Sequence, residues 1–81
     1  MNIQEFKQLD YTGRMEATAQ AICVAGRDEN IFKVLLYQLN DFYVEVYYNK
    51  LYNYISEFVA FDSADKLDPY LDRIQLPAFS V

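Results

Sequence analysis

The sequence contains no histidine and a single cysteine, and these two shortages narrow its possible chemistry. One cysteine cannot form a disulfide within the chain, and one thiol without histidine cannot build a tetrahedral zinc site of the usual kind. A nucleophilic cysteine needs a base or a positive environment, and no Cys–His pair can form here. We therefore predict no metal, no cofactor and no enzymatic activity, with Cys23 as a small apolar residue on an inner strand.

Basic residues are also scarce, with 7 against 12 acids and a net charge of −5. A protein that binds phosphate backbones needs a stripe of basic residues. The sequence shows no such stripe, so we expect no nucleic-acid partner. The N-terminal stretch MNIQEFKQLD has neither the basic region of a signal peptide nor a long apolar run that would span a membrane. We expect a cytoplasmic protein without membrane association, which a lone reduced cysteine fits.

Apolar and aromatic residues, by contrast, are abundant at 53% and 17% of the chain. This content predicts a folded chain, and the length predicts a single domain spanning residues 1–81. A chain this short buries only about 60–65% of the surface that its unfolded form exposes. Because disulfides and metals are excluded, self-association is the remaining way to supplement a thin core.

Six of the eight tyrosines fall between Tyr37 and Tyr54, in a segment typical of β-strands. We predict strands over residues 22–27, 31–39, 42–48 and 54–61. Asn40 and Asp41 form a two-residue turn, because both residue types tolerate positive φ. That turn sets a register in which Leu39 lies opposite Phe42 and every side chain is assigned to one of two faces.

The two faces differ in polarity. The more apolar face, which we assign to the core, carries Lys33, Leu35, Tyr37, Leu39, Phe42, Val44, Val46 and Tyr48. The mixed face carries Phe32, Val34, Leu36, Tyr43, Glu45 and Tyr47. We expect no element of the chain to cover the mixed face, so these six residues are the predicted binding interface. The alternative is that strands favour aromatic residues for packing reasons alone.

The last strand admits two registers. Pairing Tyr48 with Tyr54 would place Glu45 opposite Glu57, and like charges directly opposed are unfavourable. A bulge near Ser56 would relieve this contact. The same two glutamates could act as an acid–base pair. The alternative is that both side chains project into solvent or lie at the rim of an interface.

Helices are predicted at both ends of the chain. The first is a short helix capped by Asn2, and the second covers residues 13–21 behind a Thr12 cap. After the strands, Asp62 or Ser63 caps a helix whose apolar face consists of Leu67, Tyr70, Leu71 and Ile74. Pro69 either kinks this helix or begins a new one after Asp68. The order of elements predicts an α+β fold with an antiparallel four-stranded meander, whose core face both sets of helices share.

The phrases LYQLNDFYVEVYYN, ISEFVAF and DSADKLDPYLDRIQL resemble, in that order, short bacterial proteins of uncharacterised function. Their pattern is L-Y-x-L-x-x-F-[FY]-V-E-V-x-Y-[ND] followed by A-F-x-S-x-x-x-L-x-x-Y-L-x-x-I. The matching residues include Leu36, Tyr37, Phe42, Val44, Glu45, Val46, Tyr48, Ala60, Phe61, Ser63, Leu67, Tyr70, Leu71 and Ile74. The resemblance covers roughly the last two-thirds of the chain and implies a stand-alone small α+β protein. It assigns no catalytic residue.

We predict a non-enzymatic protein-interaction module that self-associates, as a homodimer, through the mixed face or an exposed strand edge, and that could bind a further protein. The alternative is a small-ligand binder with an aromatic-lined pocket between sheet and helices. A third possibility, based on net charge, is an acidic regulator that occupies the site of a basic partner.

Overall fold

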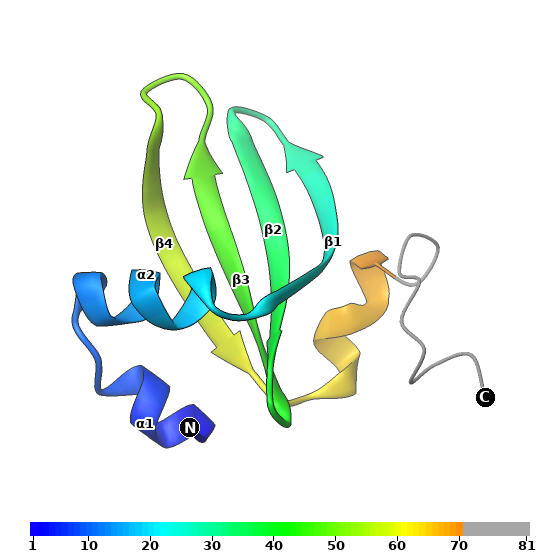
Figure 1. Cartoon of the computed structure of the whole chain (residues 1–81). Helices are drawn as coiled ribbons and strands as arrows, with labels where there is room; N and C mark the ends of the chain where they lie inside the picture. Colours follow the sequence, from blue (N-terminus) through cyan, green and yellow to red (C-terminus); the bar gives the residue numbers. More distant parts are fainter. Residues whose placement is uncertain (71–81) are drawn as a thin grey trace.

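The computed structural model describes residues 1–70, which form an antiparallel sheet flanked by short helices. The elements are α1 (Ile3–Lys7), α2 (Tyr11–Ala19), β1 (Ile22–Glu29), β2 (Phe32–Leu39), β3 (Phe42–Asn49), β4 (Tyr54–Phe61) and the 3-10 helix η1 (Ala64–Tyr70). The order of strands in the sheet follows the chain, β1-β2-β3-β4 (Figure 1). The predicted α+β meander is confirmed.

The two N-terminal helices begin at side chains that bond their first free amides. The Glu5 amide donates to the Asn2 side chain, and the Asn2 amide donates to the Glu5 carboxylate, both at 2.8 Å. The Asp10 carboxylate accepts from the Gly13 amide at 2.8 Å and caps α2. The predicted Thr12 cap was wrong. Asp10, two residues earlier, caps the helix, so α2 begins at Tyr11.

The hairpin between β2 and β3 has the predicted register, with Leu39 opposite Phe42 and Leu35 opposite Val46. The link between β3 and β4 shows which of the two registers forms. Ile55 and Glu57 pair with successive residues of β3, which leaves one extra residue of β4 between them. This is the bulge near Ser56, and it avoids the opposed carboxylates.

Each of the three hairpins turns at an asparagine in the left-handed region. The φ angles are 57° at Asn30, 55° at Asn40 and 58° at Asn53. Few side chains adopt such angles readily, but the short polar side chain of asparagine can bond locally and lowers the cost. The turns therefore hold the register of the whole sheet.

One face of the sheet packs against α1 and α2, and we call it the helix face. The Phe6 ring of α1 lies 5.9 Å from the Phe42 ring and 6.3 Å from the Phe58 ring. The buried residues of this cluster are Phe6, Leu39, Phe42, Val44 and Val46. The predicted core face is confirmed, and Figure 1 shows α2 crossing the sheet on this side before it leads into β1.

The opposite face packs against η1, and we call it the η1 face. Leu67 and Tyr70 are buried there with Leu36 and Phe61. The terminal helices therefore lie on opposite faces, whereas the sequence predicted that they would share one. The mixed face was expected to lack cover from its own chain, but Val34 and Leu36 on it are fully buried.

The C-terminal helix is a 3-10 helix that runs through Pro69. It is neither a kinked α-helix nor a fresh helix behind Asp68. Proline removes an α-type hydrogen bond, and three residues per turn place Leu67 and Tyr70 on one side. The other predicted apolar positions of this helix, at 71 and 74, lie outside the described residues.

The turn between β1 and β2 provides a clean test of the left-handed asparagines. We expect Asn30→Ala to lower the free energy of unfolding by about 1 kcal/mol, because alanine is strained at this φ. Glycine adopts positive φ freely, so Asn30→Gly should change it by no more than a few tenths of a kcal/mol. Urea denaturation of the three proteins measures both differences. Equal losses from the two substitutions would contradict the role given to φ.

Candidate functional site

A buried group of polar side chains occupies the η1 face. At its centre is the carboxylate of Glu45, which is only 6% exposed. The Tyr70 hydroxyl donates to this carboxylate at 2.6 Å, and the Arg27 guanidinium donates to the same oxygen at 3.3 Å. We define the polar cluster as Arg27, Glu29, Glu45, Tyr47 and Tyr70.

Arg27 connects the members of the polar cluster. Its Nε donates to the Tyr70 hydroxyl and one terminal nitrogen donates to the Tyr47 hydroxyl, each at 3.3 Å. Its other terminal nitrogen pairs with Glu29. The guanidinium also lies 5.6 Å from the centre of the Tyr70 ring, within cation–π range. Because the arginine side chain is 17% exposed, the ion pair with Glu45 is largely shielded from water.

The register of the sheet explains why these side chains meet. Arg27 lies opposite Val34 on β2, and Val34 lies opposite Tyr47 on β3. Glu45 belongs to the neighbouring row on the same face, across from Leu36. Since β2 contributes only aliphatic side chains to these rows, the guanidinium on β1 finds its polar partners on β3 and η1.

Burial and hydrogen bonding change the acidity of the cluster. Burial raises the pKa of Tyr70 well above its ordinary value, the bond to Glu45 raises it further, and Arg27 partly opposes both. Burial also raises the pKa of Tyr47, with a contribution from the charge of Glu45. The pKa of Arg27 is raised as well: burial acts to lower it, but hydrogen bonds to Glu29, Tyr70 and Glu45 outweigh that effect. Tyr70 thus remains a hydrogen-bond donor at neutral pH.

The polar cluster has a structural role, because its hydrogen bonds link η1 to the sheet. Both donors to Glu45 keep their protons, and the carboxylate is enclosed by its own chain. Glu57, the other carboxylate considered for acid–base chemistry, is exposed on β4 opposite Tyr47. The two glutamates therefore occupy different environments.

The structure brings the six residues of the predicted interface together on the η1 face. Three of them are buried and three are half-buried aromatic rings: Val34, Leu36 and Glu45, and Phe32, Tyr43 and Tyr47. The Tyr43 ring stacks on Phe61 at 5.7 Å, and the Phe32 ring meets Tyr47 edge-on at 6.0 Å. This face was predicted to be open, and the sequence did not reveal that η1 would close much of it.

An apolar groove lies on the helix face, where α2 stops short of covering the sheet. It encloses about 210 Å³ and we call it the tyrosine groove. Its lining residues are Met15, Thr18, Ala19, Leu35, Tyr37, Val46, Tyr48 and Ile55. The two tyrosines were assigned to the core, and no pattern in the sequence indicated the groove.

Tyr37 is the polar side chain at the α2 end of the tyrosine groove. Burial raises the pKa of its hydroxyl, and the neighbouring Cys23 adds to the shift. Cys23 itself was predicted on an inner strand, but it is an exposed free thiol because β1 is an edge of the sheet. Its Sγ lies 3.6 Å from the carbonyl oxygen of Ala25, a weak bond to its own strand.

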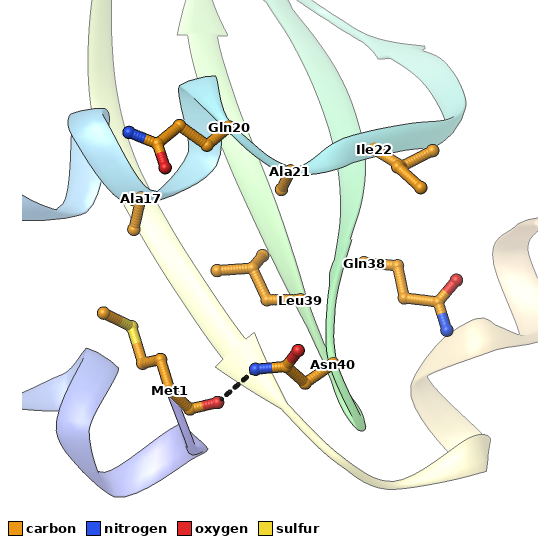
Figure 2. Close-up of a pocket in the computed structure, with 8 residues that line it drawn as sticks. All are labelled: Met1, Ala17, Gln20, Ala21, Ile22, Gln38, Leu39 and Asn40. Atoms are coloured by element: carbon orange, nitrogen blue, oxygen red, sulfur yellow. Dashed lines mark hydrogen bonds between the residues drawn. The ribbon is translucent and has the colours of Figure 1, made fainter.

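A second hollow of about 390 Å³ lies at the other end of the helix face (Figure 2). It is bounded by the first residue of the chain, the link between α2 and β1, and the turn between β2 and β3. The Asn40 side-chain amide donates to the Met1 carbonyl at 2.7 Å across it. Its lining side chains, which include Gln20 and Gln38, are uncharged.

Residues 1–70 contain neither a metal-binding cluster nor a membrane-spanning helix. No cluster of three or more His, Cys, Asp or Glu side chains is placed there to hold a metal ion. In the same range, no helix has the length and apolar character needed to cross a membrane.

Comparison of the chain with protein-family models, with curated proteins and with solved structures gives no match. The resemblance to short bacterial proteins of uncharacterised function therefore stays a prediction.

The ion pair of the polar cluster can be tested by a double-mutant cycle. We expect Arg27→Met to lower the free energy of unfolding by about 3 kcal/mol, because it leaves the buried Glu45 carboxylate without its counter-charge. Glu45→Leu should cost a similar amount, since it strands Arg27 and the Tyr70 hydroxyl. The double variant should lose clearly less than the two single losses together, as measured by urea denaturation. Additive losses would show that the two groups are not coupled.

The raised pKa of Tyr70 predicts how stability depends on pH. The folded protein keeps the phenolic proton at pH values where the unfolded chain, above about pH 10, has released it. The stability that this group contributes is therefore complete below about pH 10 and is lost as the pH rises further. Tyr70→Phe removes the titration but keeps the ring. The difference in unfolding free energy between wild type and Tyr70→Phe should be constant to about pH 9 and shrink by about pH 11. A constant difference over the whole range would contradict the shift.

Proposed function

We propose that this chain is a non-enzymatic cytoplasmic module that self-associates as a homodimer and can engage a further protein. The observation that carries the proposal is a group of large apolar side chains exposed at one end of the sheet. We define the hairpin end as Ile31, Leu51, Tyr52 and Tyr54, which are 42%, 62%, 69% and 49% exposed. Ile31 lies in the β1–β2 turn, Leu51 and Tyr52 lie in the β3–β4 loop, and Tyr54 begins β4. The turn and the loop lie next to each other in Figure 1.

Hydrogen bonds restrain the hairpin end. The Asn49 side-chain oxygen accepts from the amides of Leu51 and Tyr52 at 2.9 and 3.0 Å. The Lys50 amide donates to the Ile31 carbonyl at 2.8 Å, which fastens the loop to the neighbouring turn. A loop fixed in this way loses little entropy on association, so its exposed apolar side chains favour binding.

The same surface suits contact between two copies of the chain. Tyrosine and leucine side chains bury apolar area, and the tyrosine hydroxyl keeps a polar partner in an interface. A two-fold axis places one patch against the same patch, so an apolar surface is complementary to itself. The predicted contact through the mixed face is less favoured, because Val34 and Leu36 are buried within the chain. Contact through the edge strands is also less favoured, because bulges interrupt both β1 and β4.

Light scattering and sedimentation at micromolar concentration test the proposal. We expect a dimer that dissociates on dilution, and we expect Tyr52→Ser to weaken it by about tenfold or more, because a buried aromatic anchor is lost. Ile22→Ser is the matched control, since Ile22 is also 69% exposed but lies on β1 at the opposite end of the sheet. A monomer at all concentrations would overturn the proposal. So would equal weakening by the control.

The second candidate function, small-ligand binding, is supported by one specific observation. The tyrosine groove is a concave apolar site between sheet and helix, and two of its lining residues are aromatic. Ligand sites are typically concave and apolar with a few polar groups at defined positions. This function does not require the hairpin end and can be tested independently of self-association.

A further inference from the structure

We infer that the tyrosine groove binds an uncharged, mainly apolar molecule the size of one aromatic ring, which offers an oxygen acceptor to the Tyr37 hydroxyl. This inference rests on the second candidate function, ligand binding in the groove, and adds the chemical class of the ligand. Three features of the groove support it: its size, a lining without charge, and one hydroxyl proton that no group within residues 1–70 accepts.

The size of the groove limits the ligand to about one ring with a short substituent. Leu35 and Val46 form a cross-strand pair in the lining, and the rows on either side of this pair carry the two tyrosines. The enclosed volume of about 210 Å³ is below the roughly 300–1,000 Å³ of pockets for drug-sized ligands. It equals roughly seven times the volume of one water molecule in the liquid. Met15 of α2 is flexible and can adapt to the outline of a ring.

The lining of the groove favours a ligand without charge. Among residues 1–70, the eight that line it have side chains that are apolar or carry a hydroxyl group, and none is charged. A carboxylate or an ammonium group that moved from water into this lining would lose hydration without gaining a counter-charge, which is costly. A neutral molecule has no such cost to overcome.

Three hydroxyl groups line the groove, and two of them already donate their protons within the chain. The Thr18 hydroxyl donates to carbonyl oxygens of its own helix at 3.0 and 3.1 Å. The Tyr48 hydroxyl donates to the Asn53 side chain at 2.9 Å. Each hydroxyl has a single proton, so these two have none left for a ligand. The Tyr37 hydroxyl has no hydrogen-bond partner within residues 1–70 and is the free donor of the lining.

Tyr37 remains a donor at neutral pH and therefore selects for an acceptor. Its side chain is half-buried, and burial raises the pKa of its hydroxyl, with a contribution from Cys23. An oxygen acceptor on the ligand would take the place of water at this hydroxyl. An apolar ligand without an acceptor would cover the hydroxyl and leave its proton unpaired, and sites of this kind discriminate against such analogues.

The test compares three molecules of equal size and different polarity. Acetophenone carries one neutral oxygen acceptor beside its ring, α-methylstyrene has a methylene group in place of that oxygen, and benzoate has a charged oxygen in place of the methyl group. Binding to the full chain is followed by calorimetry and by amide chemical shifts in NMR. We expect acetophenone to bind about fivefold more tightly than α-methylstyrene, which corresponds to one neutral hydrogen bond. Benzoate should bind about tenfold more weakly than acetophenone, or not at all.

The two tyrosines of the lining provide a matched pair of variants. Tyr37→Phe removes the free hydroxyl and should abolish the preference for acetophenone over α-methylstyrene. Tyr48→Phe removes a hydroxyl that already donates to Asn53, so it should retain most of the preference. The thermal unfolding midpoint shows that each variant folds. Loss of the preference in Tyr48→Phe alone, or in neither variant, would overturn the inference.

A blocking variant and the shift map locate the site. Ala19→Leu adds bulk to the α2 side of the lining and should abolish binding of acetophenone and α-methylstyrene, while the thermal unfolding midpoint shows that the variant folds. In the unmodified chain, acetophenone should shift the amides of Leu35, Tyr37 and Val46. Shifts confined to Leu51 and Tyr52 would place the molecule on the hairpin end and overturn the inference.

The remaining outcomes distinguish failure of the ligand-binding function from failure of the ligand class. If none of the three molecules binds, both the ligand-binding function and the inference fail. If α-methylstyrene binds as tightly as acetophenone, the groove binds ligands but the required acceptor is wrong. If benzoate binds as tightly as acetophenone, the groove binds ligands but the neutral class is wrong. If self-association shifts the groove residues and excludes acetophenone, the occupant is a second copy of the chain and the inference is overturned.

Discussion

The sheet carries apolar side chains on both of its faces, and within residues 1–70 short helices cover each face: α1 and α2 on one side and η1 on the other. On the helix face, Phe6 supplies a large ring over the aliphatic residues of β3. On the η1 face, Tyr70 does the same over Leu36, but its hydroxyl has to be bonded once it is buried. Glu45 provides that bond, and Arg27 offsets the cost of burying the carboxylate. The position of η1 thus depends on a charged group inside the fold.

This dependence explains which parts of the fold could be predicted. The register of β2 and β3 follows from a local rule, because a two-residue turn at Asn40 and the alternation of side chains leave one solution. The bulge near Ser56 was one of two predicted alternatives. It follows from a similarly local rule, because like charges directly opposed on neighbouring strands are unfavourable. The cap of α2 was misplaced by two residues, which is a small local error. All of these features depend on residues close together in sequence or directly paired.

The coverage of the faces could not be predicted, because it depends on distant partners. A carboxylate on the mixed face suggested exposure, which is the usual state of glutamate. Glu45 can be buried because Arg27 and Tyr70 donate hydrogen bonds to its carboxylate. These two residues lie 18 positions before it and 25 positions after it in the chain. Neither hydrophobic periodicity nor composition indicates which arginine or tyrosine will reach a given carboxylate. The six residues of the predicted interface were correctly grouped on one face, but their exposure was a tertiary property.

The tyrosine groove was not predicted, because residues expected to be buried are only partly covered. Tyr37 and Tyr48 have the alternation of core residues, and they are indeed on the core face, but α2 lies beside them and leaves the tyrosine groove between its own side chains and the sheet. Whether an apolar residue is buried depends on where the covering helix crosses the sheet as well as on the residue's own position. The most polar face of the sheet is therefore largely filled, while the most apolar face retains an opening.

Tyr48 links the two surfaces for which functions are proposed. Its ring lines the tyrosine groove, and its hydroxyl donates to the Asn53 side chain at 2.9 Å in the loop of the hairpin end. A molecule in the groove would touch the ring whose hydroxyl holds that loop, so it would favour loop conformations compatible with the bond. Because linkage is reciprocal, association at Leu51 and Tyr52 would change affinity in the groove by the same factor. The physical basis of such coupling is one rigid side chain shared by both surfaces, and it requires no movement of the sheet.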